Sequence, residues 1–148
     1  HAQEQSINMV RCWLLPETLK SFVHNRNKEY PQHIFEIGSV VIPADNDVQS
    51  VNKDVFTCAI DDANATFTSI AQVLQNVCQI FGVNYSVKNQ QHDSFLAGRC
   101  AQILIEKTPV GYIGEIHPQV LQNLQLTMPI CAFEIDLGLL SQAIRSTK

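Results

Sequence analysis

Apolar side chains recur along this chain at two spacings, one typical of amphipathic helices and the other typical of strands. Helical spacing is clearest over residues 67–81, where Thr66 or Asn64 can cap the first turn and Gly82 suits the end of the last turn. Pro16 fits the first turn of an earlier helix with one apolar face. Two further helices are predicted over residues 118–124 and 137–144.

Runs of β-branched and aromatic residues predict the strands. A loop over residues 44–54 separates the first two strands, and a turn over residues 107–109 joins two later strands in a hairpin. Because strands and helices do not alternate strictly, we expect an α+β fold with a mainly antiparallel sheet flanked by helices. Residues 9–148 are expected to form one domain, after a disordered lead over residues 1–8 that begins with a His1-Ala2 remnant. The predicted strands cover residues 33–43, 55–60, 85–87, 101–106, 110–115 and 130–135.

Composition excludes several classes of function. The formal net charge of −4 argues against a protein that binds nucleic acid through bulk positive charge. No apolar run approaches the roughly 18 residues that a membrane-spanning helix needs. The cysteines are widely separated and odd in number, which argues against zinc and disulfides and indicates a reducing, cytoplasmic compartment. They are Cys12, Cys58, Cys78, Cys100 and Cys131.

Five short segments, taken in order, carry a resemblance to a known family. Each is weak alone, but the ordered set extends from about Val10 to Leu140. The set resembles the synthetase-like core of the phenylalanyl-tRNA synthetase β subunit, the B6–B7 region, in its archaeal and eukaryotic form. The segments are Val10-Arg11-Cys12-Trp13-Leu14-Leu15-Pro16, Ile34-Phe35-Glu36-Ile37-Gly38, Ser94-Phe95-Leu96-Ala97-Gly98-Arg99, Ile113-Gly114-Glu115-Ile116-His117-Pro118 and Phe133-Glu134-Ile135-Asp136.

The resemblance implies a fold and a role. The fold is the antiparallel sheet of class II aminoacyl-tRNA synthetases, here as part of a larger β subunit. The role is a non-catalytic module for protein biosynthesis that packs on the α subunit in a cytoplasmic (αβ)₂ heterotetramer. In this family the α subunit uses ATP and Mg to charge tRNA with phenylalanine, so we expect no cofactor on this chain and at most a minor tRNA contact.

An active class II site needs arginines that hold the phosphates of ATP. The loop that would carry the first arginine reads Ala44-Asp45-Asn46-Asp47 and is acidic. After the last predicted strand, the only arginine is Arg145, close to the end of the chain. We therefore expect no ATP binding by this chain. The segments that carry the family's editing site are not part of the match, so proofreading is not assigned to it.

No catalytic, cofactor or metal residue is predicted, and the singled-out positions are expected to serve structure or an interface. Arg99 is expected to pair with Glu115 or Glu134 across the sheet, with contact to a partner or phosphate as the alternative. Gly98 and Gly114 are interpreted as backbone requirements. The other candidates are Arg11, Trp13, Phe35, Glu36, Gly38, Phe95, His117 and Pro118, with Glu36 and Glu134 expected in ion pairs, Trp13 and Phe35 as core or interface anchors, and His117 as a helix start.

Two enzymatic alternatives stay open. One is a free-standing synthetase paralogue that activates an amino acid, against which the missing arginines argue. The other is a thiol-dependent transferase or hydrolase that uses Cys100 with His117 or His92 as the base. Nothing in the sequence supplies a third group that would orient the base.

Overall fold

The computed structural model describes residues 11–43 and 50–146 of the chain. All of the strands pair antiparallel in one six-stranded sheet, in the order β1-β2-β6-β5-β4-β3. The α+β prediction is confirmed. The elements are α1 (Leu15–His24), β1 (Gln32–Pro43), β2 (Ser50–Asp61), α2 (Phe67–Phe81), β3 (Tyr85–Asn89), β4 (Phe95–Ile105), β5 (Thr108–Ile116), α3 (Pro118–Asn123), β6 (Ile130–Asp136) and α4 (Leu137–Ser146).

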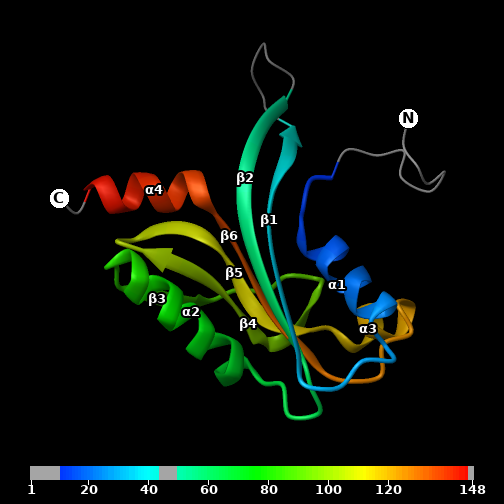
Figure 1. Cartoon of the computed structure of the whole chain (residues 1–148). Helices are drawn as coiled ribbons and strands as arrows, with labels where there is room; N and C mark the ends of the chain where they lie inside the picture. The colour runs from blue at the N-terminus through cyan, green and yellow to red at the C-terminus, as the bar shows by residue number, and fades with distance from the viewer. Residues whose placement is uncertain (1–10, 44–49, 147–148) are drawn as a thin grey trace.

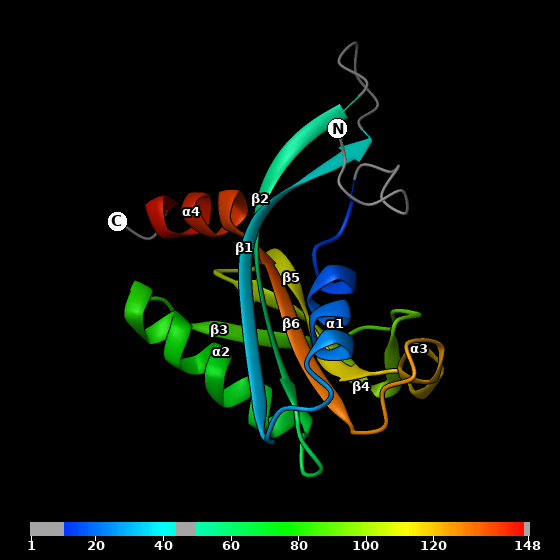
Figure 2. The ribbon, with the colours of Figure 1, turned by 45° about the vertical axis from the view of Figure 1, so that its right-hand side comes forward.

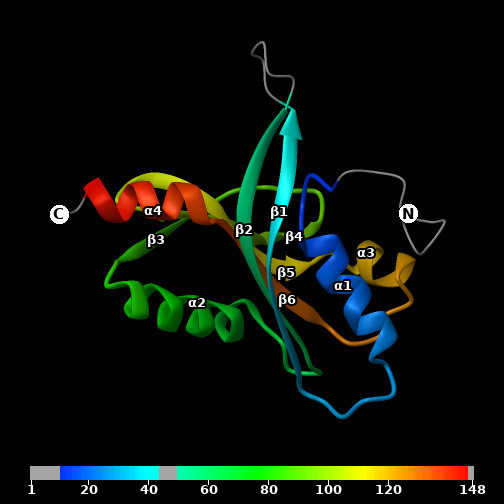
Figure 3. The ribbon, with the colours of Figure 1, turned by 45° about the horizontal axis from the view of Figure 1, so that its top comes forward.

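Helices cover both faces of the sheet (Figures 1 and 3). We call the face that carries α1 and α3 the α1 face, and the face that carries α2 and α4 the α2 face; Figure 2 shows the two layers on either side of the strands. Alternate residues of β6 point to the two faces: Ala132 packs with α1, and Phe133 packs with α2. Both faces of this central strand are therefore buried.

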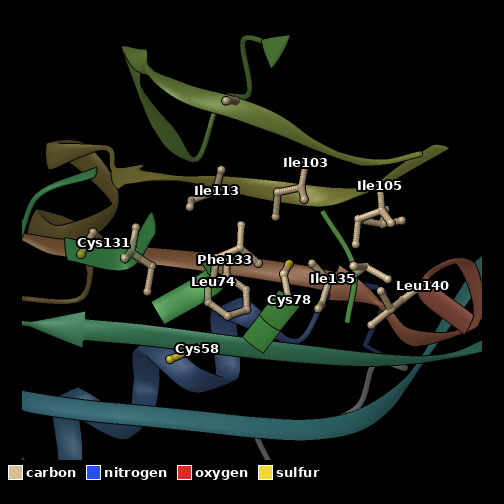
Figure 4. Close-up of a cluster of buried hydrophobic side chains, with 14 of the residues drawn as sticks. Cys58, Leu74, Cys78, Ile103, Ile105, Ile113, Cys131, Phe133, Ile135 and Leu140 are labelled. Atoms are coloured by element: carbon tan, nitrogen blue, oxygen red, sulfur yellow. The ribbon is translucent and has the colours of Figure 1, made fainter. Parts of the chain in front are cut away.

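The larger core lies on the α2 face (Figure 4). Ile70, Leu74 and Cys78 of α2 pack there against the sheet, and Leu140 of α4 joins the same cluster. The helical spacing of these residues explains why the sequence predicts α2 so clearly. The Oγ1 atom of Thr66 accepts the N–H of Ser69 at 3.3 Å, as the predicted cap requires.

The starts of β2 and β4 differ most from the prediction, and the other boundaries differ by about two residues or less. β2 begins at Ser50 rather than Val55, because residues 50–54 pair with the end of β1 beyond the border with β6 and are largely exposed, so burial imposes no apolar pattern on them (Figure 1). β4 begins at Phe95 rather than Ala101, because its first part is irregular and largely exposed. The predictions for residues 1–8 and for the acidic loop over 44–47 lie outside the described residues.

Candidate functional site

A pocket of about 500 Å³ opens on the α1 face, next to the start of α1. The segment before α1 contributes Trp13, and the loop before β4 contributes His92. The sheet contributes Tyr112 of β5 and Glu134 of β6, which are direct neighbours in the strand register. The pocket combines apolar walls with a few polar groups, as ligand sites commonly do.

One wall of the pocket is aromatic. The rings of Trp13 and His92 lie 4.7 Å apart, and those of His92 and Tyr112 lie 5.2 Å apart. Phe95 supports this wall from beneath, 6.1 Å from Trp13. The Nδ1 atom of His92 accepts the N–H of Ser94 at 3.2 Å, which fixes the orientation of the ring. Another part of the lining is aliphatic and includes Val40, Ile42 and Val55.

Glu134 joins the pocket to the start of α1. Its Oε2 atom accepts the N–H groups of Leu15 at 2.7 Å and Leu14 at 3.1 Å, which are groups that the first turn of a helix leaves unbonded. The side chain is 8% exposed. Burial raises the pKa of this carboxyl to about 7, although the two N–H groups act in the opposite direction. Glu134 is therefore a positioning group for α1 that also faces the pocket.

The rim of the pocket holds an ion pair. Lys53 of β2 lies 3.0 Å from Oδ2 of Asp136, and the Oδ1 atom of Asp136 accepts the N–H of Leu139 at 2.9 Å. The second interaction caps the start of α4. Both oxygens of Asp136 and the charge of Lys53 are thus used within the protein.

Arg11 ties the segment before α1 to β1. Its guanidinium lies 3.1 Å from Oε1 of Glu36, and its Nε–H donates to the carbonyl of Ser39 at 2.9 Å. A Cβ atom on Gly38 would lie 2.5 Å from this guanidinium, so a glycine there lets Arg11 pass close to the strand.

Glu115 binds the start of a helix on the α2 face, as Glu134 does on the α1 face. Its Oε1 atom accepts the N–H of Phe67, the first residue of α2, at 2.9 Å. Arg99 is exposed on β4. The expectation that Arg99 pairs with Glu115 or Glu134 is therefore wrong, because both carboxylates bind helix starts instead.

The two glycines of the motif segments meet backbone requirements. Gly98 has a φ of +76° and lies where the register between β4 and β5 shifts. A Cβ atom on Gly114 would lie 2.6 Å from the carbonyl oxygen of Arg99, so the two strands approach too closely for a side chain. His117 caps α3 by accepting the N–H of Gln119 at 3.0 Å, and Pro118 opens that helix.

Cys100 is buried in the core beneath α1. Burial raises the pKa of its thiol, which disfavours the thiolate that a nucleophile needs. In the described residues Nδ1 of His92 and Nδ1 of His117 both accept backbone N–H groups. This environment does not favour the thiol-enzyme alternative.

An apolar strip on β1 lies open on the α2 face, beside α2 and α4. Phe35 is 72% exposed and Ile37 is 65% exposed. Phe35 contacts Phe56 at a ring distance of 6.4 Å, and Phe56 contacts the core residue Phe133 at 5.5 Å. The strip is therefore continuous with the core. β1 is an edge strand of the sheet, and Arg11 bonds to its outer side at Ser39 and Val41.

Sequence reasoning missed the pocket. It singled out Glu115 and Glu134 but expected them in ion pairs rather than at helix starts. His92, Tyr112 and Lys53 come from separate elements, and only the strand order brings them together. The signal for the carboxylates was present: Glu115 and Glu134 each interrupt an otherwise apolar strand, and a buried acid needs a donor.

Comparison with known proteins identifies relatives. A family model described as "Phenylalanyl tRNA synthetase beta chain CLM domain" matches residues 2–137. The chain is 37% identical over 129 residues to the phenylalanine–tRNA ligase beta subunit of Thermococcus onnurineus. The aligned region covers 86% of this chain and 23% of that protein. It is 36% identical over 139 residues to the subunit of the same name from Pyrococcus abyssi. This aligned region covers 93% of this chain and 25% of that protein. The chain thus spans about a quarter of the length of these archaeal relatives.

A solved structure shares the fold. A pyrrolysyl tRNA synthetase from Desulfitobacterium hafniense superposes with a TM-score of 0.68 at 12% identity, over 86% of this chain and 47% of that chain. The expected class II synthetase-like fold is confirmed. None of the helices within the described residues is long and apolar enough to cross a membrane.

Proposed function

Because the chain belongs to the family of phenylalanyl-tRNA synthetase β chains, we propose that it is a non-catalytic, synthetase-like module that supports a catalytic partner subunit. The partner is the α subunit of the same ligase, which performs the ATP-dependent charging of tRNA with phenylalanine. The work of this chain is to present a rigid surface on which that subunit packs.

The observation that carries the proposal is the open strip of Phe35 and Ile37 on β1. Large apolar side chains that stay exposed beside a buried core mark a surface that a partner covers. The strip lies on a regular strand that is paired to β2 along its whole length, so its shape is fixed before any partner binds. A preformed apolar surface suits a permanent subunit interface.

The donor set of the pocket does not fit a nucleoside triphosphate. Glu134 and Asp136 place carboxylates on the α1 face, and the cation among the described lining residues, Lys53, is paired with Asp136. Transfer of a nucleotidyl group needs free positive charge against the phosphates. We assign ATP and Mg to the α subunit, and no reaction step to this chain.

The assembly in this proposal is an (αβ)₂ heterotetramer in the cytoplasm. The four cysteines that the structure places in the interior are free thiols, which agrees with a reducing compartment. With a formal net charge of −4, this module would contribute at most a minor share of the binding of tRNA.

Co-expression of this chain with the α subunit tests the proposal. We expect the two to co-purify, and the double variant Phe35→Thr/Ile37→Thr to lower the yield of complex at least tenfold while the chain stays folded. Ile80→Thr is the matched control, because Ile80 is 82% exposed near the end of α2 that leads into β3, and β3 is the opposite edge of the sheet from β1. Phenylalanine-dependent ATP–pyrophosphate exchange by the chain alone, or undiminished pairing by the double variant, would contradict the proposal.

A further inference from the structure

We propose that the pocket on the α1 face binds a small organic cation of the substituted-ammonium class. This site is distinct from the apolar strip of β1, which lies on the other face of the sheet, so it goes beyond the scaffold role and does not depend on it. Three properties of the pocket lead to this class of ligand: its charge, its aromatic wall and its shortage of free hydrogen-bond acceptors.

The charge in the pocket that is not neutralised by an ion pair is negative. Lys53 and Asp136 neutralise each other at a distance of 3.0 Å. Glu134 uses Oε2 for the helix start, whereas its Oε1 atom has only a long contact of 3.4 Å with the N–H of Leu14. One carboxylate oxygen therefore remains for a guest, and it attracts cations and repels anions.

The walls suit a cation that carries apolar groups. The rings of Trp13, His92 and Tyr112 form a continuous aromatic surface, and aromatic faces attract positive charge. The aliphatic part of the lining can contact methyl groups. Within the described residues no group of three or more His, Cys, Asp or Glu side chains could hold a metal ion, so these walls suit an organic cation better.

The hydrogen-bonding groups favour a substituted ammonium over a primary amine or a guanidinium. A primary ammonium has three N–H donors and a guanidinium has five, and each donor buried without an acceptor is costly. The described side chains of the pocket offer few acceptors, namely Oε1 of Glu134, the amide oxygen of Gln102 and the hydroxyl oxygen of Tyr112. A cation with few N–H groups leaves fewer donors unpaired.

The chain carries its own reporter for this site. Trp13 lies in the aromatic wall and is the single tryptophan of the sequence, so its fluorescence reports on the pocket. The experiment titrates the 148-residue chain with choline chloride at pH 8, where the Glu134 carboxylate, with a pKa of about 7, is mostly ionised. The matched probe is 3,3-dimethylbutan-1-ol, which has the shape of choline without its charge, and sodium chloride controls for ionic strength. We expect a saturable change with choline and at least tenfold weaker binding of the alcohol.

Variants test the assignment to this pocket. Glu134→Gln keeps an acceptor for α1 and removes the charge, and we expect it to weaken choline binding at least tenfold. Glu115→Gln is the control, because Glu115 binds a helix start in the same manner on the opposite face. We expect it to leave choline binding unchanged.

If Glu134→Gln does not fold, Tyr112→Leu tests the aromatic wall with the carboxylate intact and is also expected to weaken binding. The proposal is overturned if choline gives no saturable change beyond that of sodium chloride. It is overturned equally if the alcohol binds as well as choline, or if the folded Glu134→Gln or Tyr112→Leu chain binds choline as the unaltered chain does.

Discussion

Asp61 ends β2 on the buried side of the sheet, with 2% of its surface exposed. Its Oδ1 atom has no hydrogen-bond partner among the described residues. Burial, together with the neighbouring charge of Asp62, raises the pKa of the Asp61 carboxyl from 3.8 to about 6. The folded chain therefore holds the neutral acid more easily than the carboxylate.

Replacing Asp61 by Asn is expected to stabilise the chain at neutral pH. The folded pKa is raised, so the stabilisation by the neutral acid is complete below about pH 4 and is lost as the pH rises through 6. Asn imitates the neutral acid at every pH, so the gain in unfolding free energy should be near zero at pH 4 and about 1–3 kcal/mol at pH 7.5. Urea unfolding at the two pH values measures it.

The exposed Asp93→Asn variant is the control and should change little at either pH. A gain for Asp61→Asn that is equal at both pH values would contradict the electrostatic explanation. Glu134 adds to the same trend at higher pH, because its raised pKa of about 7 makes its contribution fall away between about pH 5 and 8.

At this scale the sequence predicts types of residue better than their partners. The need for glycine at 98 and 114 and the start of a helix at His117-Pro118 follow from local backbone rules, and the structure places them so. The partner of a charged side chain depends on which strands are neighbours. The sequence predicts a pair of Arg99 with Glu115 or Glu134, but both of these carboxylates bind the starts of helices.

At the scale of elements, β5 and β6 pack more closely than any side chain at one position would permit. A Cβ atom on Gly111 would lie 1.9 Å from the carbonyl oxygen of Glu134. The same residue of β6 supplies the carboxylate that binds the start of α1. The separation of β5 and β6 therefore affects the position of α1.

Gly111→Ala is expected to destabilise the chain by about 3 kcal/mol or more, because the strands must move apart. Gly138→Ala is the control: the nearest atom to its added Cβ is a side-chain oxygen of Asp136 at 3.1 Å, and the position lies in α4. We expect the control to stay within about 1 kcal/mol of the unaltered chain in urea unfolding. Equal effects of the two substitutions would argue against the close packing.

The elements themselves follow well from periodicity where one face is buried. α2 was predicted with its bounds and caps because its apolar residues face a large core. The sequence predicts β2 too short because residues 50–54 are largely exposed, so their side chains need not alternate.

At the scale of the molecule, the class of fold followed from the order of elements, and the family followed from the ordered motifs. The pocket did not follow from either. It forms where the segment before α1, the loop before β4 and the middle of the sheet meet, and these parts are distant in sequence. Only the strand order specifies that meeting.

In the strand order β1-β2-β6-β5-β4-β3, the first two strands of the chain meet the other four at a single pair of neighbouring strands. The hairpin of β1 and β2 joins the meander of β3 to β6 along the single border of β2 with β6, where Ala59 and Ala132 face each other without exposure. The loop between β2 and α2, with Ala63 and Asn64 exposed, connects the two parts covalently.

The chain is therefore divisible. Two polypeptides separated at Asn64 should find each other and rebuild the sheet, since the border between them is a continuous antiparallel pairing of largely buried residues, with one whole strand in each piece. Co-purification of the separately tagged pieces checks this, and Ala59→Arg in the first piece should prevent it. Pieces that stay apart would mean that the covalent link, rather than the border, holds the halves together.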